Sequence, residues 1–212
     1  LESGLQAGAI GRPPTYADAL NIPAENEPGT HFAYGPAPFQ IFGEIMRRKT
    51  NGNPLNYLTR RVFDHIGIAP TEWRRGADGM PFMPQGAAFT ARDWARFGDW
   101  VRTGGAGHVD RDALAQCFVP SHANPGYGMS WWLLRPGLIP PGHRAGIEVD
   151  AAMSERYGGI RMAAGAGDQR LYIVPGLDLV IARQADHILR GMFARGEARW
   201  SDADFLHALL GS

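Results

Sequence analysis

Hydrophobic and polar positions divide the chain into a helical stretch, a strand-rich stretch and one terminal helix. In the first stretch, apolar residues recur every two to four positions, as in an amphipathic helix. This pattern predicts four helices, which run from Pro38 to Lys49, from Pro54 to near Gly67, from Thr90 to Gly104 and from Asp110 to Phe118. Several boundaries carry helix-end signals, because proline suits a first helical turn, threonine caps a helix and glycine ends one.

From Tyr127 onward the apolar positions follow the period of a β-strand. Gly128 to Leu134 is expected to form a first strand. Gln169 to Val174 alternates cleanly, Pro175 and Gly176 break the pattern, and the alternation resumes at Leu177, which is typical of a β-hairpin. A last helix is expected over Asp202–Leu210, with Ser201 as its cap.

Two segments, Leu1–Pro36 and Glu72–Gln85, are expected to be irregular. The order of helices followed by strands favours an α+β fold, with a helical lobe and an antiparallel sheet flanked by helices. Residues 1–126 would contain the cleft loops and the helical lobe, and residues 127–212 the sheet with its C-terminal helix, together part of one domain.

Composition excludes several functions. The 212 residues contain 21 basic and 21 acidic side chains, so no basic field attracts nucleic acid. No run approaches the roughly eighteen apolar residues of a membrane span. Cys117 is the only cysteine, and the histidines lack metal-ligand spacing, so we expect neither a disulfide within the chain nor a bound metal or cofactor.

Two segments carry candidate chemistry. Gly165 and Gly167 precede an apolar strand, where the missing Cβ atoms would let a ligand approach the backbone; a flexible entry to the sheet is the alternative. Tyr34 stands at a turn just before the first helix and could present its hydroxyl to a cleft, or could be a packed aromatic residue. A cleft between the lobes would be lined by these two segments.

The segments that surround these residues carry a family resemblance. In order and spacing, the chain resembles the serine β-lactamases and penicillin-binding-protein-like hydrolases, most of all the branch of class C β-lactamases, esterases and 6-aminohexanoate-dimer hydrolases. The resemblance covers nearly the whole chain. It rests on PGTHFAYG, TNGNPLNYLTRRVFDHIGI, QGAAFTARDWARFGDWVRTGG, NPGYGMSWWL and GAGDQRLYIVPGLDLVIA.

The resemblance implies a β-lactamase/transpeptidase-like fold and cleavage of a small ester or amide through an acyl-enzyme. Such enzymes attack with the serine of a Ser-x-x-Lys motif, and a strand edge donates backbone N–H groups to the oxyanion. Tyr34 matches the tyrosine of the Tyr-x-Asn element and would assist proton transfer. Gly165, Ala166 and Gly167 fall where the family has Lys-Thr-Gly or His-x-Gly, and Asp168 or Gln169 would supply the oxyanion N–H.

Three departures from the family pattern modify this expectation. Pro36 stands in place of the asparagine and Gly165 in place of the cation, which argues against a β-lactamase and is compatible with an esterase or amidase. None of the six serines has a lysine three residues later, and Lys49 ends a helix, where a solvated side chain is expected.

The missing Ser-x-x-Lys motif sets the remaining expectations. We expect the nucleophile in a missing N-terminal segment, and therefore an inactive chain by itself. The alternative is a non-catalytic relative that binds a ligand or peptide in the same cleft. Relatives are often periplasmic or exported, which favours that location over the cytoplasm.

Overall fold

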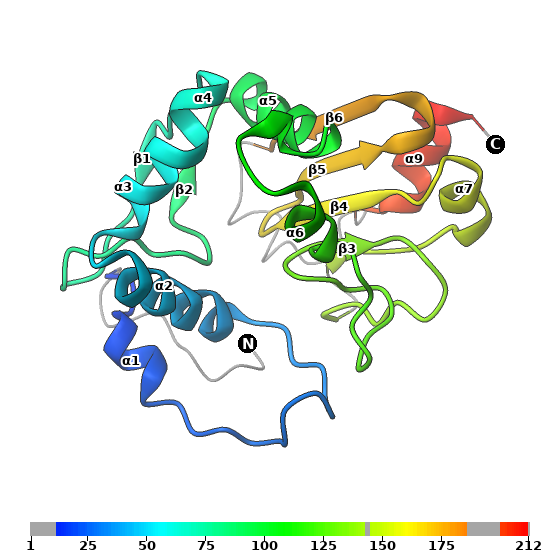
Figure 1. Ribbon diagram of the computed structural model, residues 1–212. Coiled ribbons are helices and arrows are strands. Elements are labelled where there is room, and N and C mark those ends of the chain that lie inside the picture. Colours follow the sequence, from blue (N-terminus) through cyan, green and yellow to red (C-terminus); the bar gives the residue numbers. More distant parts are fainter. Residues whose placement is uncertain (1–11, 143–144, 186–199, 212) are drawn as a thin grey trace. The chain divides into compact units, whose positions relative to one another are not determined.

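The computed structural model of the chain describes residues 12–142, 145–185 and 200–211. These residues form two compact units, Leu1–Asp93 and Trp94–Ser212, and the boundary falls inside one helix, α5 (Ala91–Arg102). The elements are labelled in Figure 1. The expected division into residues 1–126 and 127–212 stays a prediction.

The first unit is mainly helical. It contains α1 (Tyr16–Leu20), α2 (Pro36–Thr50), α3 (Pro54–Leu58), a π-helical turn η2 (Thr59–Phe63) and α4 (Asp64–Ile66). Strands β1 (Glu72–Trp73) and β2 (Ala87–Ala88) pair antiparallel. The helices predicted from Pro38 and from Pro54 are therefore confirmed, the second as three consecutive helical pieces.

Buried polar contacts tie α2 to the loops around it. The amide of Gln40, which is fully buried, donates to the carbonyl of Pro14 at 2.6 Å and accepts from the backbone of Met83 at 3.1 Å. Gly43 lies close to the Tyr16 ring. A Cβ at this position would stand 2.7 Å from the Tyr16 hydroxyl, so only glycine fits without a shift. These contacts order the segments before and after α2.

The second unit is built on a four-stranded antiparallel sheet. Its strand order is β3 (Trp132–Leu133), β4 (Arg161–Gly165), β5 (Gln169–Val174) and β6 (Leu179–Arg183). In the described part of this unit, the sheet is accompanied by α5, α6 (Arg111–Gln116), α7 (Ala151–Arg156) and α9 (Asp202–Leu210), and by the 3₁₀ turns η3 (Gly105–Gly107) and η5 (Pro175–Leu177). The expected α+β class, with an antiparallel sheet flanked by helices, is confirmed.

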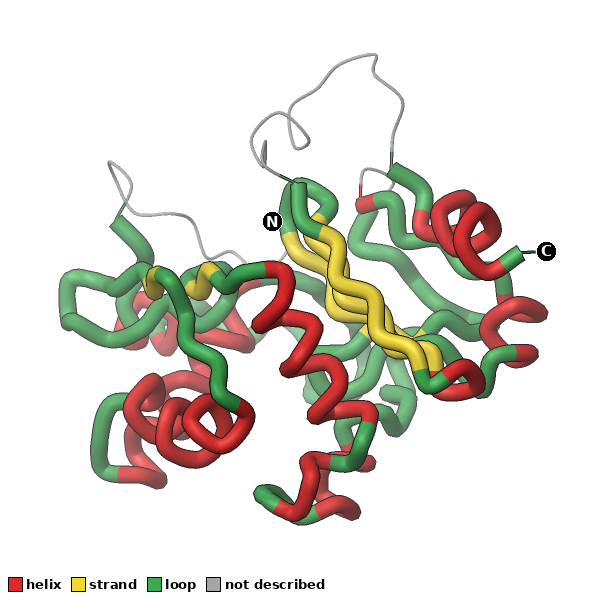
Figure 2. The backbone as a smooth tube through the Cα atoms, turned by 90° about the horizontal axis from the view of Figure 1, so that it is seen from above, coloured by secondary structure: helices red, strands yellow, loops and turns green. Residues whose placement is uncertain are grey.

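Strand β5 is covered on both faces, and α5 and α9 lie on opposite sides of the strands (Figure 2). On one face, a Cβ added to Gly98 of α5 would stand 2.9 Å from a methyl group of Leu171, so α5 approaches the sheet closely. On the other face, the Tyr172 ring stacks on Phe205 of α9 with centroids 5.6 Å apart. Alternate side chains of one strand therefore enter two apolar layers, and residues 170–174 are all buried.

The caps explain where several helices begin. Thr90 accepts from the backbone of Asp93, Asp110 from that of Ala113, and Ser201 from that of Asp204. Each bond satisfies one of the backbone donors that the first turn of a helix leaves free. The predicted helices after Thr90, from Asp110 and from Asp202 are confirmed, as is the hairpin that turns at Pro175.

Several sequence expectations need correction. The strand expected over Gly128–Leu134 shortens to Trp132–Leu133, because Ser130 has φ = 68° and the Gly128 N–H donates to the Trp131 carbonyl in a turn. The segments expected to be irregular contain α1 and β1. Strand β4 and helix α7 were not expected from the hydrophobic pattern.

Candidate functional site

A tight turn between β4 and β5 contains the five residues that the sequence marked as a strand edge. Gly165 ends β4, Gln169 begins β5 and pairs with Gly165, and residues 166–168 form the turn. Gly167 and Asp168 have φ values of 67° and 62°. Positive φ values are uncommon for residues other than glycine, and aspartate is among the residues that tolerate them best.

Side-chain donors hold the carbonyl groups of this turn. Nε2 of Gln169 donates to the Gly167 carbonyl at 3.0 Å, and the Arg183 guanidinium donates to the Asp168 carbonyl. Nη1 of Arg170 donates to the carbonyls of Gly165 and Gln169, at 3.3 and 3.1 Å. The turn is therefore fixed by three side chains of its own sheet.

This arrangement orients the backbone N–H groups of the turn. In a trans peptide, the C=O and the following N–H point in opposite directions. The Asp168 N–H therefore points away from the Gln169 amide, whereas Gln169 is paired with Gly165 in the β4–β5 ladder. Fixed backbone donors of this kind are the groups that stabilise a developing oxyanion.

The Gln169 side chain also fastens the end of β6. Its Nε2 donates to the Ala185 carbonyl at 2.9 Å, and its Oε1 accepts from the Ala185 N–H at 3.1 Å. The predicted substrate-side residue thus has a positioning role within the sheet. Its carboxamide connects the turn to the chain beyond the next strand.

A buried ion pair fixes Arg170, the side chain that donates to the carbonyls of Gly165 and Gln169. Nε of Arg170 lies 2.8 Å from Oδ1 of Asp202, the first residue of α9, and the two side chains are 2% and 0% exposed. The same Oδ1 accepts from Oη of Tyr172 at 2.5 Å and from Nε1 of Trp200 at 2.7 Å. Burial, followed by the charge of Asp202, raises the pKa of Tyr172, so its phenol stays a hydrogen-bond donor.

The hydrophobic pattern did not identify this pair as part of the site. Arg170 and Asp202 are 32 positions apart, and each has an ordinary local explanation, as a strand residue and as an acid in a first helical turn. A signal was present in the sequence, because a charged residue within a strand that is otherwise apolar needs a buried partner.

Tyr34 lies in the first unit, two residues before the start of α2. Gly35 is the N-cap of this helix and Pro36 its first residue, a position where the missing N–H of proline costs nothing. The Tyr34 ring is half-buried and meets Phe39 edge-on, with centroids 6.4 Å apart and an angle of 78° between the planes. Pro36, which departs from the family pattern, is thus explained by the local helix geometry.

Most of the serines in the described part of the chain have structural roles. Ser121 Oγ donates to the Asn124 carbonyl, Ser154 Oγ accepts from the backbone of Ile160, and Ser201 caps α9. Ser130 is exposed in a turn. Lys49 is also exposed, in the last turn of α2.

The described residues form neither a group of metal ligands nor a membrane-spanning helix. Across residues 12–142, 145–185 and 200–211, no three His, Cys, Asp or Glu side chains gather as metal ligands would. Within the same ranges, no helix has the length and apolar character needed to cross a bilayer.

Comparison with solved structures identifies the fold. A protein from Bacillus anthracis, provisionally named as a 6-aminohexanoate-dimer hydrolase, superimposes with a TM-score of 0.62 at 18% identity, over 92% of this chain and 49% of that one. A provisionally named β-lactamase from Bacteroides dorei gives 0.58 at 16% identity, over 86% and 62%. A β-lactamase from Mycobacterium bovis gives 0.59 at 18% identity, over 91% and 69%.

The chain therefore has the fold of the β-lactamase-like hydrolases. It spans about half the length of the Bacillus anthracis protein. Comparison with models of protein families and with curated protein sequences finds no significant match.

Proposed function

We propose that this chain contributes part of the acyl-transfer site of a serine hydrolase related to the β-lactamases, acting on a small ester or amide through an acyl-enzyme. The observation that carries the proposal is the β4–β5 turn, where the Gln169 side chain holds the Gly167 carbonyl so that the Asp168 N–H is oriented in advance. The fold shared with β-lactamase-like hydrolases supports the same conclusion.

The turn would act on the charge that develops during acyl transfer. When a nucleophile attacks an ester or amide carbonyl, the oxygen becomes an oxyanion, and one fixed donor contributes about 2.7–4 kcal/mol of transition-state stabilisation. The N–H of Asp168 or Gln169 would supply such a donor. Gly165, Ala166 and Gly167 would form the adjacent wall, where the small side chains leave room for substrate.

Tyr34 would assist proton transfer. A phenol with an ordinary pKa of about 10 is a poor base unless a cation stabilises its anion. The family supplies that cation from the Ser-x-x-Lys lysine, and this chain has no such motif. We therefore propose that the nucleophile and the lysine come from a segment of the same protein outside these residues, and that the chain by itself is inactive.

The substrate class follows from the two departures. Gly165 brings no cation to hold a substrate carboxylate, and Pro36 brings no amide to hold a substrate carbonyl. Both departures favour an esterase or amidase over a β-lactamase. We propose a periplasmic or exported location, in line with many relatives.

A second function is favoured by the same two residues. With Pro36 and Gly165 in place of polar groups, the chain could be a non-catalytic relative that binds a ligand or peptide without acylation. The two proposals differ in one respect. Only the hydrolase requires a Ser-x-x-Lys motif in the complete gene.

Activity-based probes test the proposal on the chain itself. A fluorophosphonate and a labelled penicillin should leave all six serines of the 212 residues unmodified, with an intact class C β-lactamase as positive control. Labelling of Ser130, which is exposed, would overturn the assignment of the nucleophile to another segment. Sequencing the gene upstream of Leu1 then separates the two functions.

A further inference from the structure

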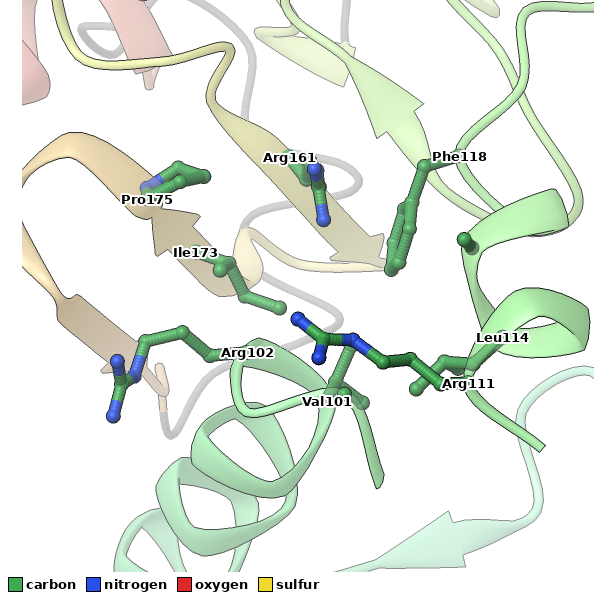
Figure 3. A pocket seen from close by; sticks show the side chains of 10 residues that line it. Val101, Arg102, Arg111, Leu114, Phe118, Arg161, Ile173 and Pro175 are labelled. Atoms are coloured by element: carbon green, nitrogen blue, oxygen red, sulfur yellow. The ribbon is translucent and has the colours of Figure 1, made fainter. Parts of the chain in front are cut away.

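A concave site lies in the second unit, at the other end of the β4–β5 ladder from the candidate turn. It is a pocket of about 440 Å³ between α5, α6 and the sheet (Figure 3). Arg161 and its register partner Ile173 line the pocket, and Arg161 is four residues along β4 from Gly165, or about 13 Å. The pocket is therefore distinct from the proposed oxyanion wall.

The pocket combines apolar walls with arginine side chains. Val101, Leu114 and Ile173 supply aliphatic surface, and Phe118 supplies an aromatic face. Its volume falls within the range of about 300–1,000 Å³ that is typical of small-molecule sites. Three of the lining residues are arginines, and none of the described residues that line it is an aspartate or glutamate.

Arg161 presents a cation that the described protein leaves without an acidic partner. Its guanidinium carbon lies 4.1 Å from the centroid of the Phe118 ring. Burial lowers the pKa of Arg161, which reports the loss of hydration around this charge. An aromatic face compensates only part of that loss.

Arg111 approaches the same space from the opposite side. Its side chain crosses Gly104, where an added Cβ would stand 3.2 Å from Nε of Arg111. Gly104 also has φ = 76°, a conformation that favours glycine. Figure 3 shows the guanidinium groups of Arg111 and Arg161 pointing into the cavity between Ile173 and Phe118.

Arg102 is different, and it provides a matched control. Its guanidinium points away from the cavity in Figure 3 and is bound by Asp99 at 2.9 Å and by Asp178 at 2.6 Å. The pocket thus holds two arginines whose charges face its interior and a third whose charge is neutralised outside.

We propose that this pocket binds a small organic carboxylate with an apolar tail, its head held between Arg111 and Arg161 and its tail against Val101, Leu114 and Ile173. Guanidinium groups match the planar geometry of a carboxylate and form charge-assisted hydrogen bonds with it. The carboxylate restores to the half-buried Arg161 the opposite charge that the lining residues lack. The aliphatic wall takes up the hydrocarbon part of the ligand.

Calorimetric titration of the 212-residue chain with octanoate tests the proposal. We expect saturable 1:1 binding that weakens with salt, and no binding of octanamide, the neutral analogue. Arg111→Gln and Arg161→Gln should each weaken octanoate binding about 10- to 100-fold, because each removes a charge-assisted contact. Arg102→Gln should leave the affinity within about twofold, because that guanidinium faces outward.

Several results would overturn the proposal. These are no octanoate binding, equal binding of octanoate and octanamide, an affinity for inorganic phosphate as high as for octanoate, or equal loss in Arg102→Gln and Arg161→Gln. If a variant fails to fold, the wild-type chain still decides the matter. The NMR signals of the Nε–H groups of Arg111 and Arg161 must then shift on octanoate addition, while that of Arg102 must not.

Discussion

Removal of the Asp202 carboxylate is expected to destabilise the second unit strongly. Asp202 is fully buried, and its Oδ1 accepts three hydrogen bonds, from Arg170, Tyr172 and Trp200. Asp202→Ala leaves the Arg170 charge buried without its counterion. Loss of one partner from a buried pair costs about 3–5 kcal/mol, and we expect a decrease of this size in the free energy of unfolding.

A double-mutant cycle separates the ion pair from other effects of truncation. Arg170→Met alone should also cost about 3–5 kcal/mol, because it leaves a buried carboxylate with two neutral donors. The double variant should cost less than the sum of the single variants, with a coupling of at least about 2 kcal/mol. Asp204→Ala, at an exposed acid in the same helical turn, should cost no more than about 1 kcal/mol and serves as the control.

The assay is equilibrium urea unfolding of the whole chain. Circular dichroism and tryptophan fluorescence follow the transition; Trp200, whose indole donates to Asp202, contributes to that fluorescence. A cost below about 1 kcal/mol for Asp202→Ala, or additive costs in the cycle, would refute the claim that this pair supports the turn. Because Arg170 also holds the carbonyls of Gly165 and Gln169, hydrogen exchange at the turn should accelerate in the same variants.

Four further changes test separate parts of the account. Gly98→Ala places a Cβ 2.6 Å from a Val180 methyl group. The cost of this overpacking, about 1–3 kcal/mol, should exceed the roughly 1 kcal/mol gain in helix propensity and lower the urea midpoint. A raised midpoint would contradict the close approach of α5. The Arg47 hydrogen bond lowers the pKa of Glu44 from 4.5 to about 2. The free energy of unfolding should therefore fall by about 1–2 kcal/mol as the pH drops through that interval, less than the full pKa shift implies because solvent screens the exposed arginine partners. Glu44→Gln should remove this dependence. Gln169→Ala should speed hydrogen exchange at the turn and cost about 1–3 kcal/mol by urea unfolding; unchanged exchange would contradict its positioning role. In the complete protein, Tyr34→Phe should lower kcat for a p-nitrophenyl ester about 10²- to 10⁴-fold, and unchanged kcat would refute its part in proton transfer.

The depressed pKa of Glu44 sets the direction in which stability changes with pH. The folded-state pKa of Glu44 is depressed, so its ionised form favours the native state. The contribution is complete above the unfolded pKa and is lost as pH falls toward the folded pKa. A free energy of unfolding that increases as the pH falls from 4.5 to 2 would contradict the assignment.

Local signals in the sequence were enough to predict α2, the helical stretch from α3 to α4, α5, α6, α9 and the final hairpin, but not α1 or α7. Thr90, Asp110 and Ser201 each cap a helix through one side-chain oxygen, and caps act over only a few residues. The strand Gln169–Val174 could be predicted because its alternate side chains enter two different apolar layers. The capping box of Thr15 and Asp18, which begins α1, was also present but lies inside a segment rich in glycine and proline.

Long-range partners explain what the sequence did not predict. Strand β4 contains Ala163, Ala164 and Gly165, whose small side chains produce no alternation, and it is a strand because β5 pairs with it along its length. The Arg170–Asp202 pair and the contact of Arg183 with the turn join residues from different elements. Such contacts follow from the topology, which the local pattern does not encode.

The central claim is that the β4–β5 turn serves an acyl-transfer site whose nucleophile lies outside these residues. The most direct measurement is mass spectrometric mapping of fluorophosphonate labelling in the complete gene product. We predict one labelled serine, in a Ser-x-x-Lys motif outside the 212 residues, and no label on any of the six serines within them. A label on any of these six serines, or no labelled serine in the complete protein, would contradict the claim.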